Sequence, residues 1–312
     1  MGILFCFLFV LISSATACDR CVHQSKAAYF SQASALSGKF QFLCSLYLES
    51  CLGDTEIVSL ISKLKFDGDP DDILVRIFVG DFWFCGSVAA GACGYGPLAI
   101  GLNGGHLAAG VSSLYKDGAG CGACFQIRCK NSKLCTSKGA KVILTDINKN
   151  NQTDLVLSSR AFRAMANEGM DRDISRLGIV DVEYKRVPCD YKNQNLAIRV
   201  EESSKKPNYL AIKLLNQGGQ TEVVAIDVAQ VGSINWGFMS RNYGAVWDTS
   251  RVPAGALQFR FVVTAGYDGK WIWAKKAVLP EDWKNGVAYD TGVQITDIAQ
   301  EGCSPCDAGD WK

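Results

Sequence analysis

Alternation of hydrophobic and polar residues indicates short β-strands through the C-terminal part of the chain. Five segments have strand character: 196–200, 209–215, 222–228, 256–264 and 271–277. Turn-forming sequences separate them, such as Lys-Lys-Pro-Asn at 205–208 and Tyr-Asp-Gly-Lys at 267–270. Short strands at this spacing, with no helical pattern between them, predict an antiparallel β-sandwich over 194–293.

The region 91–193 is rich in glycine and cysteine and also predicts short strands. Helical patterns occur only at 158–167 and 170–177, and Ser158 or Ser159 could cap the first of these helices. Domains usually span about 100–200 residues, so 312 residues favour two domains. The pattern as a whole therefore predicts a mainly β protein with two domains.

The first seventeen residues predict a secretory signal peptide. They carry no charged side chain, and an apolar run at 3–12 is followed by Ala-Thr-Ala at 15–17, which is typical of a cleavage site. The run is too short to span a bilayer of ~30 Å, which needs about 20 apolar residues. We therefore expect cleavage before Cys18, secretion of the mature chain and no membrane anchor.

Charge and cysteine usage agree with an extracellular protein. The 32 Lys and Arg against 31 Asp and Glu give a net charge of +1, which argues against a nucleic-acid partner. The chain has 14 Cys, and the C-x2-C spacings at 18/21, 121/124 and 303/306 could indicate zinc. In a secreted chain with only two His, disulfides are the better interpretation. No metal and no cofactor are expected.

Residues 38–90 differ from the rest of the chain. They contain three Cys, an acidic patch and two apolar runs, and their removal leaves ten Cys in the mature chain, an even number. The segment starts with Gly-Lys, which a retained splice-donor sequence could encode. We favour the hypothesis that 38–90 is a gene-model artefact. The alternative is a real loop insertion, and sequencing the transcript distinguishes the two.

Motifs in both parts of the chain, in their order, resemble the expansin superfamily. The first part contains Gly-Ala-Cys-Gly-Tyr-Gly at 91–96, Gly-Cys-Gly-Ala-Cys-Phe at 120–125 and Val-Ile-Leu-Thr-Asp at 142–146. The second contains Asn-Trp-Gly at 235–237, Ser-Arg-Asn-Tyr-Gly-Ala-Val-Trp at 240–247 and Val-Leu-Pro-Glu-Asp-Trp at 278–283. The Cys-Asp-Arg-Cys opening at 18–21 and the C-terminal extension look like the expansin-like A group.

The resemblance implies a fold and a domain plan. It implies a six-stranded double-psi β-barrel followed by an immunoglobulin-like β-sandwich similar to the family-63 carbohydrate-binding module. With the signal peptide at 1–17, the barrel domain would span 18–193, the sandwich 194–293 and a Cys-containing extension 294–312. It also implies the disulfides Cys93–Cys121, Cys124–Cys189 and Cys129–Cys135, and leaves the pairing of Cys18, Cys21, Cys303 and Cys306 open.

The barrel resembles that of family-45 glycoside hydrolases, which invert with one carboxylic acid and one carboxylate base. Alignment through 157–162 puts Val156 where other expansins keep an acidic residue, while a two-residue slip would bring Asp154 there. Asp146 follows a predicted strand and matches a groove Asp of some expansins; a solvated strand-end carboxylate is the equal alternative. One carboxylate does not supply both acid and base, so we expect no hydrolase, with a weak inverting glucanase as the alternative.

The resemblance also implies a platform of aromatic rings in the second domain. Tyr209, Trp236 and Tyr243 match the surface residues on which sugar rings stack. Trp247 is expected in the core, and Trp271 and Trp273, which share one strand face, are expected to be packing or edge residues. Asn151 begins a glycosylation sequon, Asn-Gln-Thr.

Together these observations predict a secreted plant cell-wall protein that binds cellulose, xyloglucan or another hemicellulose without hydrolysis, and that loosens contacts between glucans. It is expected to act as a monomer, with no nucleic-acid partner. A structural or signalling protein of the wall, without loosening activity, is a further alternative.

Overall fold

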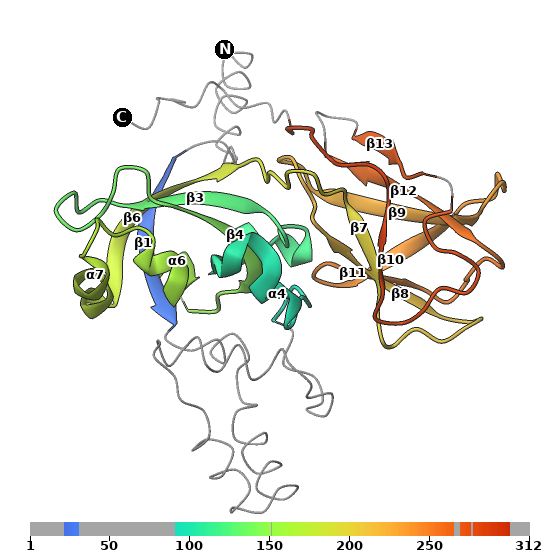
Figure 1. The fold of residues 1–312 in the computed structure, drawn as a ribbon, viewed down its shortest axis with the longest axis horizontal. Coiled ribbons are helices and arrows are strands. Elements are labelled where there is room, and N and C mark those ends of the chain that lie inside the picture. Colours follow the sequence, from blue (N-terminus) through green and yellow to red (C-terminus); the bar gives the residue numbers. More distant parts are fainter. Residues whose placement is uncertain (1–21, 31–90, 151, 265–268, 276, 300–312) are drawn as a thin grey trace, which may run out of the picture.

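The computed structural model describes residues 22–30, 91–150, 152–264, 269–275 and 277–299. Two β-rich domains lie side by side (Figure 1). The predictions for the signal peptide, for 38–90, for Asn151 and for the cysteines at 18, 21, 303 and 306 lie outside the described residues.

The first domain is a closed barrel of six strands in the order β1-β5-β2-β4-β3-β6. The strands are β1 (His23–Phe30), β2 (Leu107–Gly110), β3 (Cys124–Cys129), β4 (Ala140–Ile147), β5 (Leu155–Ser158) and β6 (Ile179–Val187). The pairs β1–β5 and β2–β4 are parallel, and the other four are antiparallel. The predicted six-stranded barrel is confirmed.

Short helices cover the barrel. They are α4 (Leu98–Gly101), η2 (Leu102–Gly105), α5 (Ser112–Tyr115), η3 (Lys116–Gly118), α6 (Ser159–Arg163) and α7 (Asp171–Leu177). The Ser158 hydroxyl accepts the amide proton of Ala161 at 3.2 Å, so Ser158 is the cap of α6. This helix is shorter than the predicted 158–167. The chain leaves the helix after Arg163 and continues as a non-helical turn that buries Met165.

All three disulfides that the resemblance implied are present: Cys93–Cys121, Cys124–Cys189 and Cys129–Cys135. The first joins the two glycine-rich segments near 93 and 121, and the second joins the start of β3 to the end of the domain. The third joins the two sides of the loop after β3. Such links typically contribute about 2–4 kcal/mol by restricting the unfolded chain. The Cys93–Cys121 and Cys124–Cys189 disulfides brace loops on the side of the barrel that meets the second domain, and Cys129–Cys135 closes a loop at the other end of β3.

The second domain is one curled sheet of eight strands in the order β13-β12-β9-β10-β11-β8-β7-β14. The strands are β7 (Ala197–Val200), β8 (Leu210–Leu215), β9 (Val223–Gln230), β10 (Gly237–Tyr243), β11 (Val246–Thr249), β12 (Leu257–Val263), β13 (Lys270–Trp273) and β14 (Ala288–Asp290). The first half of β10 pairs with β9 and the second half with β11. Because β10 belongs to both halves, the sheet folds over into the two layers of a sandwich.

The core lies between these two layers. Phe259 and Phe261 of β12 and Ile212 of β8 are fully buried and belong to one cluster. Trp247 is 3% exposed in the same cluster, which confirms its expected place in the core. Residues that alternate with these core positions point outward, so each half of the sheet presents an outer face.

The five predicted strands correspond to β7, β8, β9, β12 and β13, with ends that differ by a few residues. The sequence did not predict β10, β11 and β14. In β10 a register shift between Arg241 and Tyr243 interrupts the alternation, and β14 is three residues long. Within the part of the chain that the structure describes, no helix is long and apolar enough to cross a membrane.

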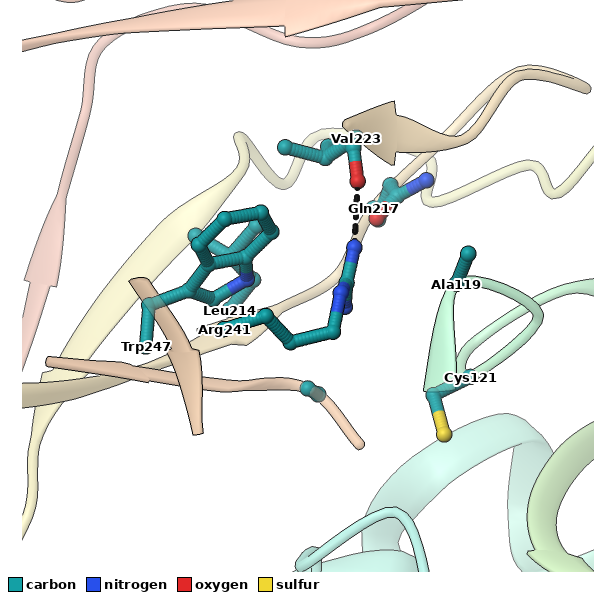
Figure 2. A pocket seen from close by; sticks show the side chains of 8 residues that line it. Ala119, Cys121, Leu214, Gln217, Val223, Arg241 and Trp247 are labelled. Atoms are coloured by element: carbon teal, nitrogen blue, oxygen red, sulfur yellow. Dashed lines mark hydrogen bonds between the residues drawn. The ribbon is translucent and has the colours of Figure 1, made fainter. Parts of the chain in front are cut away.

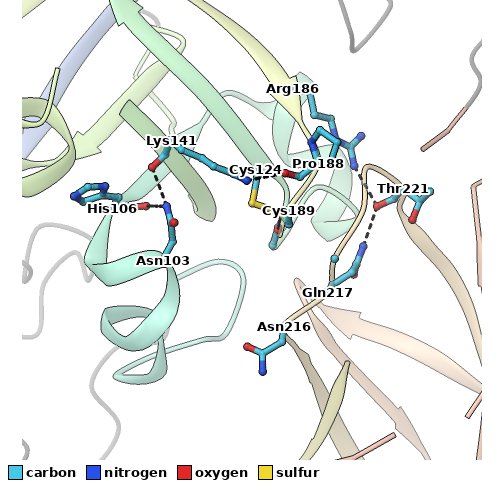
Figure 3. The surroundings of a disulfide bond; sticks show 12 residues. Asn103, His106, Cys124, Lys141, Arg186, Pro188, Cys189, Asn216, Gln217 and Thr221 are labelled. Atoms are coloured by element: carbon cyan, nitrogen blue, oxygen red, sulfur yellow. Dashed lines mark hydrogen bonds between the residues drawn. A yellow bond between two sulfur atoms is a disulfide. The ribbon is translucent and has the colours of Figure 1, made fainter. Parts of the chain in front are cut away.

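The domains meet through main-chain and charged contacts. Cys189 of the barrel and Gly219 exchange two backbone hydrogen bonds, of 2.8 and 3.1 Å. Arg186 on β6 donates to the Thr221 carbonyl at 3.2 Å, beside the Cys124–Cys189 disulfide (Figure 3). The junction is thus hydrogen-bonded in the manner of a small sheet.

The Glu222 carboxylate forms ion pairs with two cationic side chains of the barrel. Its Oε1 lies 2.8 Å from Lys116 Nζ and 3.0 Å from Arg186 Nη1. The Arg186 side chain is 6% exposed and that of Glu222 15%. This shared carboxylate fixes the second domain against two separate segments of the barrel.

Arg241 of β10 extends the junction (Figure 2). Its guanidinium lies 4.2 Å from the Trp247 ring and donates to the carbonyls of Gly118, Gly244 and Val223. A Cβ on Gly244 would lie 2.5 Å from the Ala92 carbonyl oxygen, so the turn after β10 fits against the barrel only as glycine. The orientation of the two domains is therefore defined by tight packing.

Candidate functional site

Asp146 lies near the end of β4, where the barrel faces the second domain. Its Oδ1 accepts the amide protons of Ala92 at 2.7 Å and of Ile147 at 2.8 Å. Burial raises the pKa of this carboxyl, and the two amide donors and Lys149 act in the opposite direction. Asp146 is thus a partly buried carboxyl that holds the segment 91–96 on the barrel, not a freely solvated strand end.

Asp154 has different partners. It precedes β5, its Oδ2 accepts from the Tyr184 hydroxyl at 3.2 Å, and its carbonyl accepts from the Val111 amide at 2.9 Å. Tyr184 lies on β6 and is 4% exposed. Asp154 is therefore tied toward β6, whereas Asp146 is tied toward the segment 91–96.

Val156 occupies the centre of β5, between the fully buried Leu155 and Leu157. It pairs with Ala109 of β2, which on its other side pairs with Asp146 of β4. Neighbouring strands lie about 4.8 Å apart, so Asp146 and Val156 stand roughly two strand spacings from each other. A carboxylate at 156 would lie at a separation typical of an inverting pair, but a valine side chain transfers no proton.

Tyr243, at the end of β10, lies directly against the segment 91–96. A Cβ on Gly94 would lie 2.8 Å from Tyr243 Cε2, so the phenol ring packs on the Gly94 backbone. The ring remains 45% exposed. Because Ala92 of the same segment is bonded to Asp146, the candidate barrel residue and the candidate stacking residue lie on two sides of one loop.

Tyr209 lies on the same outer face as Tyr243. Its hydroxyl donates to Asp248 Oδ2 at 2.8 Å, and Asn242 donates to the same oxygen at 2.6 Å. Burial raises the pKa of Tyr209, and the hydrogen bond to Asp248 and the nearby Tyr243 add to the effect. Asp248 thus holds the Tyr209 phenol in a fixed place beside the end of β10.

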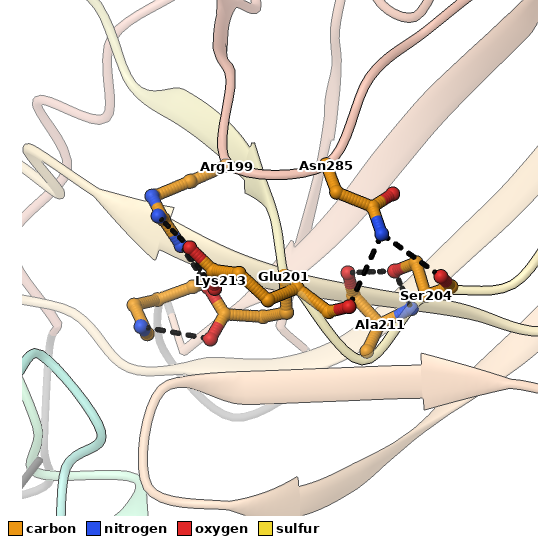
Figure 4. Close-up of polar contacts among 7 residues, drawn as sticks. Arg199, Glu201, Ser204, Ala211, Lys213 and Asn285 are labelled. Atoms are coloured by element: carbon orange, nitrogen blue, oxygen red, sulfur yellow. Dashed lines mark hydrogen bonds and ion pairs between the residues drawn. The ribbon is translucent and has the colours of Figure 1, made fainter. Parts of the chain in front are cut away.

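A buried ionic network (Figure 4) lies close to Tyr243. Glu201 bonds Lys213 at 2.9 Å and Arg199 at 3.0 Å, and the Lys213 side chain is 5% exposed. Burial raises the pKa of Tyr243, and the charges of Glu201 and Glu202 raise it further. Both tyrosines are therefore neutral phenols at physiological pH, in front of a rigid polar layer.

Trp236 lies elsewhere. It precedes the end of β10 that pairs with β9, and its ring centroid is 5.3 Å from that of Trp273 on β13. From 236 to 243 the chain runs at most roughly 23 Å at about 3.3 Å per residue. The three aromatic residues expected to form one platform are thus divided between two faces, with Tyr209 and Tyr243 on one and Trp236 on the other.

Trp236 belongs to what we call the second aromatic cluster, defined as Trp236, Trp271, Trp273 and Arg260. The Arg260 guanidinium lies 4.3 to 5.2 Å from the centroids of the three indole rings. Trp271 and Trp273 are 45% and 53% exposed on the edge strand β13. The expectation of edge positions for these two tryptophans is confirmed.

Several residues of these faces were missed in the sequence. Asp248 and Asn242 fix Tyr209, and Arg260 organises the tryptophans, yet each looks like an ordinary polar residue of a strand. The available signal was the alternation of Asp248 with the core residue Trp247, and of Arg260 with Phe259 and Phe261. Among the described residues, no group of three or more His, Cys, Asp or Glu gathers in a way that could hold a metal ion.

Two family models match the chain, one in each domain. Residues 107–184 match a double-psi barrel family described as lytic transglycolase, and residues 196–280 match the expansin C-terminal domain. These spans coincide with most of the closed barrel and of the curled sheet.

Two solved structures share the fold. They are Clavibacter michiganensis expansin without ligand and a point mutant of it in complex with cellohexaose. Each aligns at a TM-score of 0.55 and 18% identity over 88% of this chain and 97% of theirs. At this identity the likeness supports the fold alone.

Curated relatives match over much more of the sequence. Expansin-like A1 and A2 of Arabidopsis thaliana are 56% and 57% identical over 315 aligned residues, covering 99% and 100% of this chain and 99% of each relative. Expansin-like A3 of Oryza sativa subsp. japonica is 54% identical over 68% of this chain and 76% of the relative. On these matches the chain belongs to the expansin superfamily and, within it, to the expansin-like A group.

Proposed function

We propose that the protein binds cellulose or hemicellulose through the face that carries Tyr209 and Tyr243, without cleaving the glycan, and thereby loosens contacts between glucan chains. The proposal places it as a monomer in the extracellular region, in the plant cell wall. The observation that carries it is the continuity of this face with the barrel loop that Asp146 holds.

Stacking supplies the attraction. A β-linked glucan presents a flat face of C–H bonds, and an aromatic ring offers a negative face that attracts them and removes apolar area from water. The Tyr243 ring is open on one side and packed on Gly94 on the other, and Tyr209 is held by Asp248. Rings fixed in this way lose little side-chain freedom on binding.

The barrel favours binding without hydrolysis. Inverting cleavage needs a proton donor and a base on opposite sides of the glycosidic bond. Asp146 offers one carboxyl, but Val156 stands near the place of a second, and Asp154 is bonded toward Tyr184. A glucan that bound both the tyrosine face and the barrel would be held across the junction and drawn away from neighbouring chains.

The test is a binding assay on insoluble cellulose combined with a measurement of released reducing sugar. The Tyr209→Ala/Tyr243→Ala double variant should lose most of its binding, and the parent should release no sugar. Ile234→Ala, which removes a 90% exposed apolar side chain from another loop, is the matched control and should bind like the parent. Equal binding by the double variant and the parent would exclude the tyrosine face.

A weak inverting glucanase is the second candidate, favoured by the raised pKa of Asp146, which is a property of general acids. It predicts released reducing ends that vanish in Asp146→Asn. A structural or signalling protein of the wall predicts neither binding nor released sugar.

A further inference from the structure

The second aromatic cluster has no role in the function proposed above. It lies on the outer face of the half-sheet β13-β12-β9, where Arg260 alternates with the core residues Phe259 and Phe261. Tyr209 and Tyr243 lie on the other half of the curled sheet. The cluster is thus a separate surface of the same domain.

The indole rings are held from below and open above. Arg260 lies beneath them, with its side chain 22% exposed. Trp271 and Trp273, whose residues pair with Val262 and Arg260 across the ladder, are about half exposed. Their positions are set by cation–π contact with the guanidinium of Arg260, which lies mostly beneath the rings.

The charge of this surface is already balanced. Asp227 of β9 bonds Arg260 through two contacts, of 2.8 Å to Nε and 2.7 Å to Nη2. The Asp227 side chain is 14% exposed. An anionic polymer such as a pectin would gain no unpaired cation from Arg260, whereas an uncharged sugar ring loses nothing by covering it. The charge balance therefore favours a neutral ligand.

The rings form a corner, not a plane. Trp236 meets Trp273 edge to face, at an interplanar angle of 88°. A flat crystalline cellulose surface can contact only coplanar rings. A corner of rings instead fits a single glycan chain, because one face of a pyranose ring can stack on one indole while the edge of the same sugar contacts the second indole. A corner with a neutral, half-exposed aromatic lining is typical of a site for a single glycan chain.

We propose that the second aromatic cluster binds a single, soluble, uncharged polysaccharide chain of the hemicellulose class, and that it does so independently of the tyrosine face. With both faces occupied, one molecule would hold two different glycan chains roughly 20 Å apart, the distance that β10 spans between them. Only this bridging rests on the function proposed above.

The test compares two double variants of the full chain. Trp271→Ala/Trp273→Ala should bind soluble xyloglucan at least about tenfold more weakly in titration calorimetry, equivalent to about 1.4 kcal/mol, and should bind insoluble cellulose like the parent. Tyr209→Ala/Tyr243→Ala should show the reverse. Polygalacturonate, an anionic chain, should show no difference between the parent and the tryptophan variant.

The outcomes separate the two proposals. Unchanged xyloglucan binding by the tryptophan variant would overturn the second site, and so would loss of xyloglucan binding in the tyrosine variant alone. Failure of the tyrosine variant to affect cellulose binding would overturn the proposed function and leave the second site intact. If the tryptophan variant is monomeric where the parent sediments as a dimer, and its xyloglucan affinity is unchanged, the surface is a contact between two copies and the proposal is wrong.

A second measurement does not depend on folding of the tryptophan variant. Xyloglucan should shift the tryptophan fluorescence of the parent and of Tyr209→Ala/Tyr243→Ala alike, because a stacked sugar shields the exposed indoles from water. No shift at saturating xyloglucan would contradict the proposal.

Discussion

The carboxylate at the domain junction offers a sharp test of how the two domains are held together. Glu222→Gln keeps the shape and one acceptor oxygen but removes the negative charge that Lys116 and Arg186 share. Arg186 is almost fully buried at its side chain, so its charge has little access to water. We expect the substitution to lower the free energy of unfolding.

The magnitude follows from the two contacts. Removing one partner of a fully buried pair costs about 3–5 kcal/mol, but glutamine still accepts a neutral hydrogen bond, which recovers about 1 kcal/mol. The pair with Lys116 is 31% exposed on the lysine side and contributes less than about 1 kcal/mol. The net loss should be about 3 kcal/mol, or roughly 6–12 °C in the melting temperature.

The measurement is urea unfolding followed by tryptophan fluorescence. The matched control is Glu202→Gln, which changes a 68% exposed carboxylate paired with Arg199 inside one domain and should cost at most about 0.5 kcal/mol. If Glu222→Gln costs no more than this control, the shared ion pair does not hold the domains, and main-chain contacts such as Cys189–Gly219 must carry the junction.

Three further predictions concern stability. Gly244→Ala, at φ +50° with its Cβ 2.5 Å from a carbonyl oxygen of the barrel, should cost about 1–3 kcal/mol more in urea unfolding than Gly232→Ala, at φ +83° with nothing within 4 Å; equal costs would mean that the junction yields. Burial raises the pKa of Asp146 in the folded state, so protonation of this carboxyl favours folding. The free energy of unfolding of the parent, relative to that of Asp146→Asn, should be greatest below about pH 4 and should fall as pH rises through the folded pKa. If this difference in free energy instead rises with pH, Asp146 does not have a raised pKa. Ser158→Ala should lose about 1–2 kcal/mol, because the hydroxyl caps α6 and also joins the residues at 105 and 107; a similar loss in Ser159→Ala would show that the cap is not the cause.

The sequence predicted the parts of the fold that follow from local pattern and family motif. Strands such as β7 and β12 show clear alternation because one side of each faces a continuous core, whereas β8 is buried on both sides. The sequence predicts Ser158 or Ser159 as the N-terminal cap of α6, and Ser158 is the cap. The disulfides came from the order of the cysteines in the family resemblance, and no spacing rule alone would have selected those three pairs.

The division of the aromatic residues could not be predicted from local pattern. Trp236 directly precedes β10 and Tyr243 ends it, and both point outward. The strand leaves one layer for the other between Met239 and Ser240, and the register shift near Arg241 changes the alternation. A curled sheet places outward positions on different faces, and curling depends on pairing partners that are distant in sequence. The pairing of Asp227 with Arg260 is likewise visible only after β9 and β12 are paired.

The strand β10 has a mechanical consequence. It begins beside the tryptophan cluster, ends where Tyr243 rests on the barrel, and is hydrogen-bonded to β9 over its first half and to β11 over its second. A pull applied between the two faces would run along the strand and load those hydrogen bonds in shear, so that they yield together and not one after another. The polypeptide between the two surfaces would therefore resist extension, and, if both surfaces bind glycans as proposed, a force between those glycans would pass along β10.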